Sequence, residues 1–183
     1  VWQAADGTWQ LWSCIRNTLT PGKTRLFHRW EGKNLTDPNW TPKGIAMEAD
    51  PTLGETQGGL QAPYVFKVDD TYFMLYGDWE NICLATSKDG KQFTRKDVSG
   101  GKPTLFTEIL GANARDPMAI RVGDRWLCYY TAFPNEQGAV YCRTSPNLLD
   151  WSEATTVAFG GQSGTGPFSS ECPFVVQYHN EYY

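Results

Sequence analysis

The chain has 183 residues, enough for one domain with a substantial core. A net charge of −4 and a pI of about 5.2, with no run of Lys or Arg, exclude nucleic acids and anionic membrane surfaces as natural partners. No apolar stretch is long enough to span a bilayer. The five cysteines form no Cys-x-x-Cys pair, which predicts free thiols and no zinc site, although one bridge between Cys128 and Cys142 stays open.

The first segment, residues 1–49, has the pattern of a β-hairpin followed by two further strands. Asp6 and Gly7 form the hairpin turn, and Trp9 opens the second strand. A third strand covers residues 26–30, and Trp40 opens the fourth. The segment therefore predicts a four-stranded antiparallel sheet.

Segments 61–98 and 115–158 repeat this pattern, and segment 171–183 begins it again. In each, a proline is followed nine residues later by an aromatic, with an alternating apolar run, a polar turn and a second run between them. The prolines recur at intervals of 54 and 56 residues. The three pairs are Pro63 with Tyr72, Pro117 with Trp126, and Pro173 with Tyr182.

Each complete repeat continues with a third strand, at 82–87 and 140–145, and then a turn that ends on Phe93 or Trp151. Four antiparallel strands repeated about every 55 residues indicate the blades of a β-propeller. We therefore expect an all-β fold with about three blades and the start of a fourth. The alternative is a β-sandwich with turns at similar spacing. The register places the first blade's proline one residue before Val1, which predicts a natural protein longer at both ends.

Two acids fall at equivalent points of adjacent repeats. The first strand of a propeller blade lines the central axis, and its beginning faces the funnel where ligands bind. Ala62, Asp116 and Cys172 precede the repeated prolines, and Glu171 lies one position earlier. Asp116 and Glu171 are therefore expected to face one pocket, the arrangement that cleavage of a glycosidic bond requires. Alone, Asp116 is more typical of an Asp-Pro turn that caps the start of a strand, and the alternative for Glu171 is a solvated rim charge.

Residues 114–117 and 170–173 resemble two of the three signature motifs of glycoside hydrolase family 32, the β-fructofuranosidase and fructanase group. The wider clan includes families 43, 62, 68 and 117, and shares a five-bladed propeller with three acidic residues. The resemblance implies that Glu171 is the general acid/base, and that Asp116 stabilises the transition state and binds sugar hydroxyls beside a substrate-binding Arg115. It implies hydrolysis of a furanoside-type oligo- or polysaccharide without a cofactor.

The sequence departs from that family at two places. The family's nucleophilic Asp opens the first blade in an Asn-Asp-Pro-Asn-Gly motif, and Asp37 lies in a similar stretch. The repeat register places Asp37 in an outer turn, so we expect the true counterpart immediately before Val1. Residues 61–63 replace a Ser-Gly-Ser-like stretch. This departure leaves open an inverting, family 43-type arabinofuranosidase or xylosidase-like enzyme.

The loops after the second strands offer further candidates. Trp79 and Phe133 are possible sugar platforms, although packing between blades would also explain them, and Asp78 could bond a sugar hydroxyl. Neither His28 nor His179 stands in a metal-binding pattern, so no metal is expected. A non-catalytic sugar-binding propeller remains the rival function, whereas two axial acids disfavour a protein-interaction propeller. A secreted or periplasmic location is slightly favoured, and the sequence indicates no oligomeric state.

Overall fold

The computed structural model describes the backbone of residues 1–183 and every side chain except that of Ser163. The first sheet consists of β1 (Trp2–Gln3), β2 (Trp9–Ile15), β3 (Leu26–Gly32) and β4 (Thr41–Met47). The second consists of β5 (Gln61–Val68), β6 (Thr71–Gly77), β7 (Asn81–Ser87), β8 (Thr94–Arg95) and β9 (Thr104–Thr107). The third consists of β10 (Arg115–Val122), β11 (Arg125–Ala132), β12 (Ala139–Ser145) and β13 (Thr155–Phe159), and a hairpin of β14 (Gln177–Tyr178) and β15 (Glu181–Tyr182) follows.

Three short 3₁₀-helices lie in the connections: η1 (Pro51–Leu53), η2 (Pro134–Glu136) and η3 (Gly161–Ser163). No helix among the described residues is long and apolar enough to cross a membrane.

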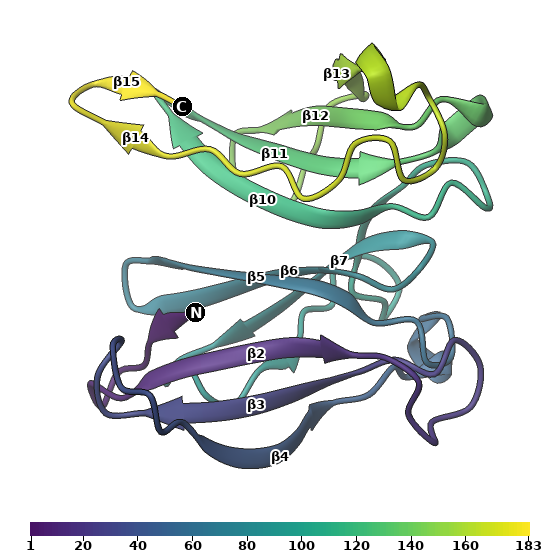
Figure 1. Cartoon of the computed structure of the whole chain (residues 1–183). Helices are drawn as coiled ribbons and strands as arrows, with labels where there is room; N and C mark the ends of the chain where they lie inside the picture. The colour runs from purple at the N-terminus through teal and green to yellow at the C-terminus, as the bar shows by residue number, and fades with distance from the viewer.

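The sheets follow one another in chain order, from purple through teal to green in Figure 1. All strand pairs are antiparallel between neighbours in sequence, except that β9 also pairs with β7. Strand β10 packs against β5 and β6 of the preceding sheet, and β2 packs against β5. We call the three sheets blades 1, 2 and 3. The predicted all-β fold of successive antiparallel blades is confirmed, and a sandwich of two sheets is excluded.

Two apolar clusters fill the spaces between neighbouring blades. The cluster of blades 1 and 2 contains the buried side chains of Trp12, Phe27 and Met74, and Phe93 packs on Trp12 with ring centroids 5.3 Å apart. In the other cluster Trp151 packs on Phe106. The aromatic residues that end the predicted turns of blades 2 and 3, Phe93 and Trp151, therefore pack against these clusters.

The outer edge of blade 2 differs from the sequence prediction. Strand β8 has two residues, and β9 pairs with the other end of β7 through Ile82 and Phe106. A turn in which the amide of Lys102 donates to the carbonyl of Ser99 separates the two strands. Gly100 and Gly101 in this turn have φ of 61° and 81°, a region that glycine enters without steric cost.

Ala62, Asp116 and Cys172 share an unusual backbone conformation, with φ of 43°, 55° and 54°. Non-glycine residues seldom adopt positive φ, and the proline that follows each residue favours extended backbone instead. In blades 2 and 3 a β-bulge lies at this point, where the pairing between first and second strand shifts. Bulges redirect side chains, and strained backbone clusters at functional sites. The three positions are therefore structurally equivalent, as the repeat predicted.

A buried Glu–Tyr–Arg triad attaches each connection between blades to the blade that follows. Glu55 accepts a hydrogen bond from Tyr76 at 2.7 Å, and Arg95 binds both its carboxylate oxygens at 2.7 Å. The second triad consists of Glu108, Tyr130 and Arg143. Burial raises the pKa of both tyrosines well above the usual value, so both hydroxyls stay protonated as donors. The two tyrosines lie at equivalent points of the repeat, whereas the spacing to the Glu and Arg partners differs between the two blades.

Asp37 lies in the turn between β3 and β4, as the register predicted. Its Oδ1 accepts a hydrogen bond of 2.9 Å from the amide of Asn39, which is typical of an Asx-turn. It lines a hollow with Glu31 and Lys43. This hollow is separate from the pocket that contains Asp116 and Glu171, described below.

Candidate active site

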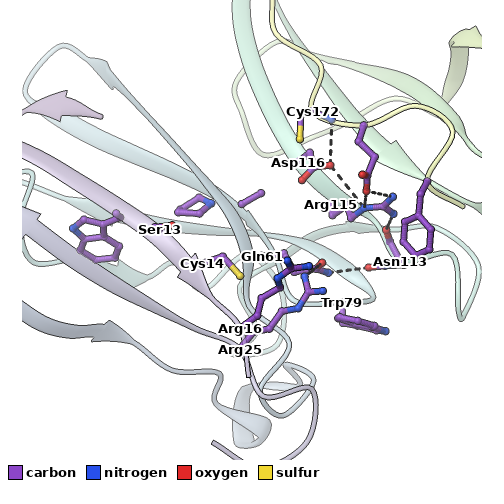
Figure 2. A pocket seen from close by; sticks show the side chains of 15 residues that line it. Ser13, Cys14, Arg16, Arg25, Gln61, Trp79, Asn113, Arg115, Asp116 and Cys172 are labelled. Carbon is purple, nitrogen blue, oxygen red and sulfur yellow. Dashed lines mark hydrogen bonds and ion pairs between the residues drawn. The ribbon is translucent and has the colours of Figure 1, made fainter. Parts of the chain in front are cut away.

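A pocket of about 550 Å³ opens where the first residues of β5 and β10 meet the end of β2 and the segment 168–172. Figure 2 shows Arg115 and Asp116 on one side of this pocket and Arg16, Arg25 and Gln61 across from them. Residues of all three blades and of the segment before β14 therefore contribute to one site.

Arg115 joins blade 3 to Glu171. Its Nε and Nη2 both donate to Glu171 Oε1, at 3.0 and 2.7 Å, and Nη2 also donates to the carbonyl of Pro167 at 2.7 Å. The Arg115 side chain is 5% exposed, whereas that of Glu171 is 41% exposed. The buried guanidinium therefore fixes one carboxylate oxygen, and Glu171 remains accessible from the pocket.

Asp116 lies beside this ion pair at the bulge of β10. Its Oδ2 is 3.8 Å from Nε of Arg115 and accepts a hydrogen bond of 3.3 Å from the amide of Cys172. The two predicted acids thus line one pocket, and Arg115 contacts both of them. Both acids lie close to a repeated proline, Asp116 one residue before Pro117 and Glu171 two residues before Pro173, so the repeat brings them to neighbouring points of the pocket.

Cys172 faces the same pocket, and its thiol is free. Partial desolvation raises the pKa of this thiol, and the nearby carboxylates of Asp116 and Glu171 raise it further. A protonated thiol is a poor nucleophile. The pocket chemistry therefore centres on the carboxylates.

Trp79 lines the pocket from the loop after β6, where its sequence position suggested a sugar platform. Lys23 Nζ lies 4.5 Å and Arg25 Cζ 4.8 Å from the centroid of its ring, so cation–π contacts hold the indole. Its φ of 89° shows that the loop turns sharply at this residue. The structure places Trp79 at the site, and its contact with a sugar remains a prediction.

Asp78 and Phe133 are absent from the lining of this pocket. Asp78 is fully buried, and its carboxylate accepts hydrogen bonds from Asn81 and from the amide of Glu80. Burial raises the pKa of Asp78, and these bonds oppose that effect. The expected sugar contact of Asp78 is therefore wrong: this carboxylate closes the β6–β7 turn. Phe133 lies at the start of η2, where its amide donates to the carbonyl of Ala112.

Phe168 is the phenylalanine that lines the pocket, whereas Phe133 does not. Phe168 is 72% exposed, and Arg115 Cζ lies 5.7 Å from its ring centroid. Sequence reasoning missed this residue because it lies in the Gly- and Ser-rich connection before Glu171, outside the repeat.

Sequence reasoning also missed a set of hydrogen bonds that crosses the pocket floor. Arg25 Nη1 donates to Gln61 Oε1 at 2.6 Å, and Gln61 Nε2 donates to Asn113 Oδ1 at 2.8 Å. Arg115 Nη1 donates to the main-chain oxygen of Asn113 at 3.1 Å. Side chains from blades 1, 2 and 3 are therefore connected to Glu171.

Among the residues that the structure describes, no group of three or more His, Cys, Asp or Glu side chains could hold a metal ion. All five cysteines are free thiols, so Cys128 and Cys142 are not joined. The acids that line the pocket within the described part of the chain are Asp116 and Glu171.

The family model described as the glycosyl hydrolases family 32 N-terminal domain matches residues 22–182. No curated protein has a sequence that matches this chain.

Several solved structures share the fold. A GH32 beta-fructofuranosidase of Bombyx mori is 18% identical, with a TM-score of 0.70 over 96% of this chain and 38% of that enzyme. A thermostable family-43 glycoside hydrolase is 22% identical, with a TM-score of 0.69 over 96% of this chain and 58% of its own. Sucrose-6-phosphate hydrolase from Lactobacillus gasseri is 15% identical, with a TM-score of 0.69 over 97% and 37%. The chain thus spans well under half of the length of the beta-fructofuranosidase and of the sucrose-6-phosphate hydrolase.

Proposed function

The chain belongs to glycosyl hydrolase family 32 through the N-terminal domain of that family, and on this premise we propose that the protein hydrolyses the glycosidic bonds of a furanoside-type oligo- or polysaccharide. One observation carries the proposal: Asp116 and Glu171, which lie one and two residues before the prolines of neighbouring repeats, line one pocket and flank the buried Arg115. Paired carboxylates across a sugar-sized pocket are the machinery of glycoside hydrolysis.

Glu171 is assigned the role of proton donor. Both of its bonds to Arg115 end on Oε1, so Oε2 is the oxygen left to meet the glycosidic oxygen of a substrate. Protonation of the leaving oxygen lowers the barrier to bond cleavage. In a retaining enzyme the resulting carboxylate then accepts a proton from the water that hydrolyses the glycosyl-enzyme, whereas in an inverting enzyme the other reacting carboxylate accepts the proton of the attacking water. An exposed side chain held by a buried partner suits this exchange with substrate and solvent.

Asp116 is assigned to binding sugar hydroxyls and stabilising positive charge at the anomeric carbon. A fixed carboxylate near an oxocarbenium-like centre lowers the energy of the transition state more than that of the ground state. Its backbone strain and its bond from the Cys172 amide keep the carboxylate in place before substrate arrives.

The reaction also needs a third carboxylate, which acts as the nucleophile or as the base that activates water. We place this carboxylate in a part of the protein outside residues 1–183. A β-fructosidase-like enzyme would retain the anomeric configuration, with reacting carboxyl groups about 5–5.5 Å apart. A family 43-type enzyme would invert it, with a separation of about 6.5–9.5 Å. The activity is therefore a property of the whole protein.

The test is hydrolysis by the full-length protein of sucrose, fructo-oligosaccharides, arabino-oligosaccharides and xylo-oligosaccharides, followed by proton NMR of the first product anomer. We expect the protein to release a sugar product from a furanoside substrate, and we expect Asp116→Asn to lose this activity. A sugar-binding propeller would instead bind one of these ligands in calorimetry without cleaving it, and that result would refute the proposal.

A further inference from the structure

Gln61 occupies in blade 2 the position that Arg115 holds in blade 3 and Glu171 holds at the start of the fourth repeat. Each lies two residues before a repeated proline. Gln61 is 3% exposed and Arg115 4%. The amide of Gln61 is engaged on both sides, since its Oε1 accepts from Arg25 and its Nε2 donates to Asn113. A buried amide with both ends bonded acts as a link in the structure and is poorly placed to bind substrate.

Asn113 transmits this link to Arg115. Its φ of 51° is a left-handed conformation, which asparagine adopts more readily than most residues but which still needs support from its surroundings. The bond from Gln61 Nε2 to Asn113 Oδ1 supplies that support, and the main-chain oxygen of Asn113 then accepts from Arg115 Nη1. Gln61 therefore influences the orientation of the peptide that anchors the guanidinium.

The guanidinium of Arg115 is a rigid plane with three anchors. Nη1 binds the carbonyl of Asn113, Nη2 binds that of Pro167, and Nε with Nη2 binds Glu171. Because the plane is rigid, loss of the Asn113 anchor tilts the edge that binds Glu171. A displacement of about 1 Å in a reacting group can lower a rate by about 10²-fold.

We infer that Gln61 and Asn113 are positioning residues for Glu171, which act through Arg115 and touch neither the reacting bond nor its proton. The inference rests on the proposed function, because it needs Glu171 to donate a proton. It also gives a physical reason for Gln61 at this point of the chain: an amide offers both the acceptor for Arg25 and the donor for Asn113.

The experiment uses full-length protein and three variants. Gln61→Glu preserves size and the acceptor for Arg25 but removes the donor to Asn113. Asn113→Gly removes the amide while tolerating the positive φ. Asn113→Asp keeps an acceptor for Gln61. Gln92→Glu, at an exposed site away from the pocket, is the matched control for the change in charge. Substrates are a furanoside oligosaccharide and an aryl furanoside with an activated leaving group.

We expect Gln61→Glu and Asn113→Gly to lower kcat on the oligosaccharide by about 10-fold, with little change in KM. This loss is smaller than the ~10²-fold loss for a displacement of about 1 Å, because two other anchors of Arg115 remain. The loss on the aryl furanoside is smaller because that leaving group needs little protonation. Asn113→Asp retains more activity than Asn113→Gly, and Gln92→Glu behaves as the parent protein.

Equal losses on the two substrates, or a raised KM with unchanged kcat, would overturn the positioning role and indicate a direct substrate contact or a general structural defect. Unchanged activity in Gln61→Glu and in Asn113→Gly would also overturn the positioning role. The parallel variant Glu171→Gln separates this failure from that of the proposed function. If Glu171→Gln shows the leaving-group effect and Gln61→Glu does not, the positioning role alone fails; if Glu171→Gln has no effect, the proposed function fails.

Discussion

Arg115 donates two hydrogen bonds to a single oxygen of Glu171, at 3.0 and 2.7 Å, although 56 residues separate the two in sequence. The guanidinium is buried in blade 3, and the carboxylate belongs to the segment that begins the next repeat. The bond therefore joins two neighbouring repeats at the pocket and leaves Oε2 of Glu171 for substrate. The first two predictions follow from this contact.

The first prediction separates the roles of the two acids in the full-length protein. Glu171→Gln keeps the shape and loses the proton, which lowers kcat/KM on an oligosaccharide by about 10²–10⁴-fold and on an aryl glycoside by less. Asp116→Asn lowers kcat/KM on both substrates, because hydroxyl binding and charge stabilisation do not depend on the leaving group. Steady-state kinetics on the two substrates measure both effects. If Glu171→Gln lowers kcat/KM equally on the oligosaccharide and on the aryl glycoside, Glu171 is not the proton donor.

The second prediction concerns the fork geometry of Arg115. Arg115→Lys keeps the charge but cannot bind Glu171, Asn113 and Pro167 at once, so we expect kcat to fall by about 10²-fold. Arg121→Lys, at an exposed position on the same strand, is the matched control and should leave kcat unchanged. If Arg115→Lys stays within twofold of the parent enzyme, charge alone suffices at this position and the fork is unnecessary.

The third prediction concerns the stability contributed by the first buried triad. The Glu55 side chain is 1% exposed, and that of Arg95 is 20% exposed. Breaking a buried pair costs about 3–5 kcal/mol, and the lower end applies to Glu55→Gln because water can reach Arg95. The free energy of unfolding from urea titration measures this loss. Glu153→Gln, at an exposed site, should change it by less than about 0.5 kcal/mol. A similar small change in Glu55→Gln would mean that the triad contributes little to stability.

The fourth prediction concerns acid sensitivity of the contact between blades 1 and 2. Lys91 Nζ lies 2.6 Å from Asp6 Oδ2 and 2.7 Å from Glu31 Oε2. Its hydrogen bonds lower the pKa of Glu31 to about 2 and lower that of Asp6. Because the folded state lowers these pKa values, their stabilisation is present above the unfolded values near ~4 and is lost as the pH falls towards about 2.

Thermal unfolding measured at several pH values from about 6 to about 2 tests this loss of stabilisation. Lys91→Met should flatten the decline in Tm below about pH 4, whereas Lys96→Met, at an exposed site, should preserve the parent profile. Both carboxylates lie near solvent, so we expect the Tm profiles of Lys91→Met and the parent to differ by only a few degrees. Added salt should reduce this difference. A Lys91→Met profile parallel to that of the parent would contradict the assignment of the acid effect to this cluster.

Much of the architecture was accessible from the sequence because it depends on periodicity. Alternation of apolar residues, turn residues between runs and the repeated proline predicted the strands of blades 1 to 3 and their order. The edge of blade 2 was missed, since β9 follows a turn and rejoins β7 by pairing that no local pattern indicates.

For the candidate site, the sequence by itself determined the position of Asp116 and Glu171, because a repeat that fixes backbone register also fixes which residues begin equivalent strands. Only the tertiary structure decided which side chains meet there. It buried Asp78 in a turn, brought Phe168 to the pocket in place of Phe133, and joined Gln61 to Asn113. The partners of Asp78 lie within three residues of it in the β6–β7 turn. The contacts of Gln61 and Phe168 instead join residues far apart in sequence, where packing selects rotamers and partners that a one-dimensional pattern does not specify.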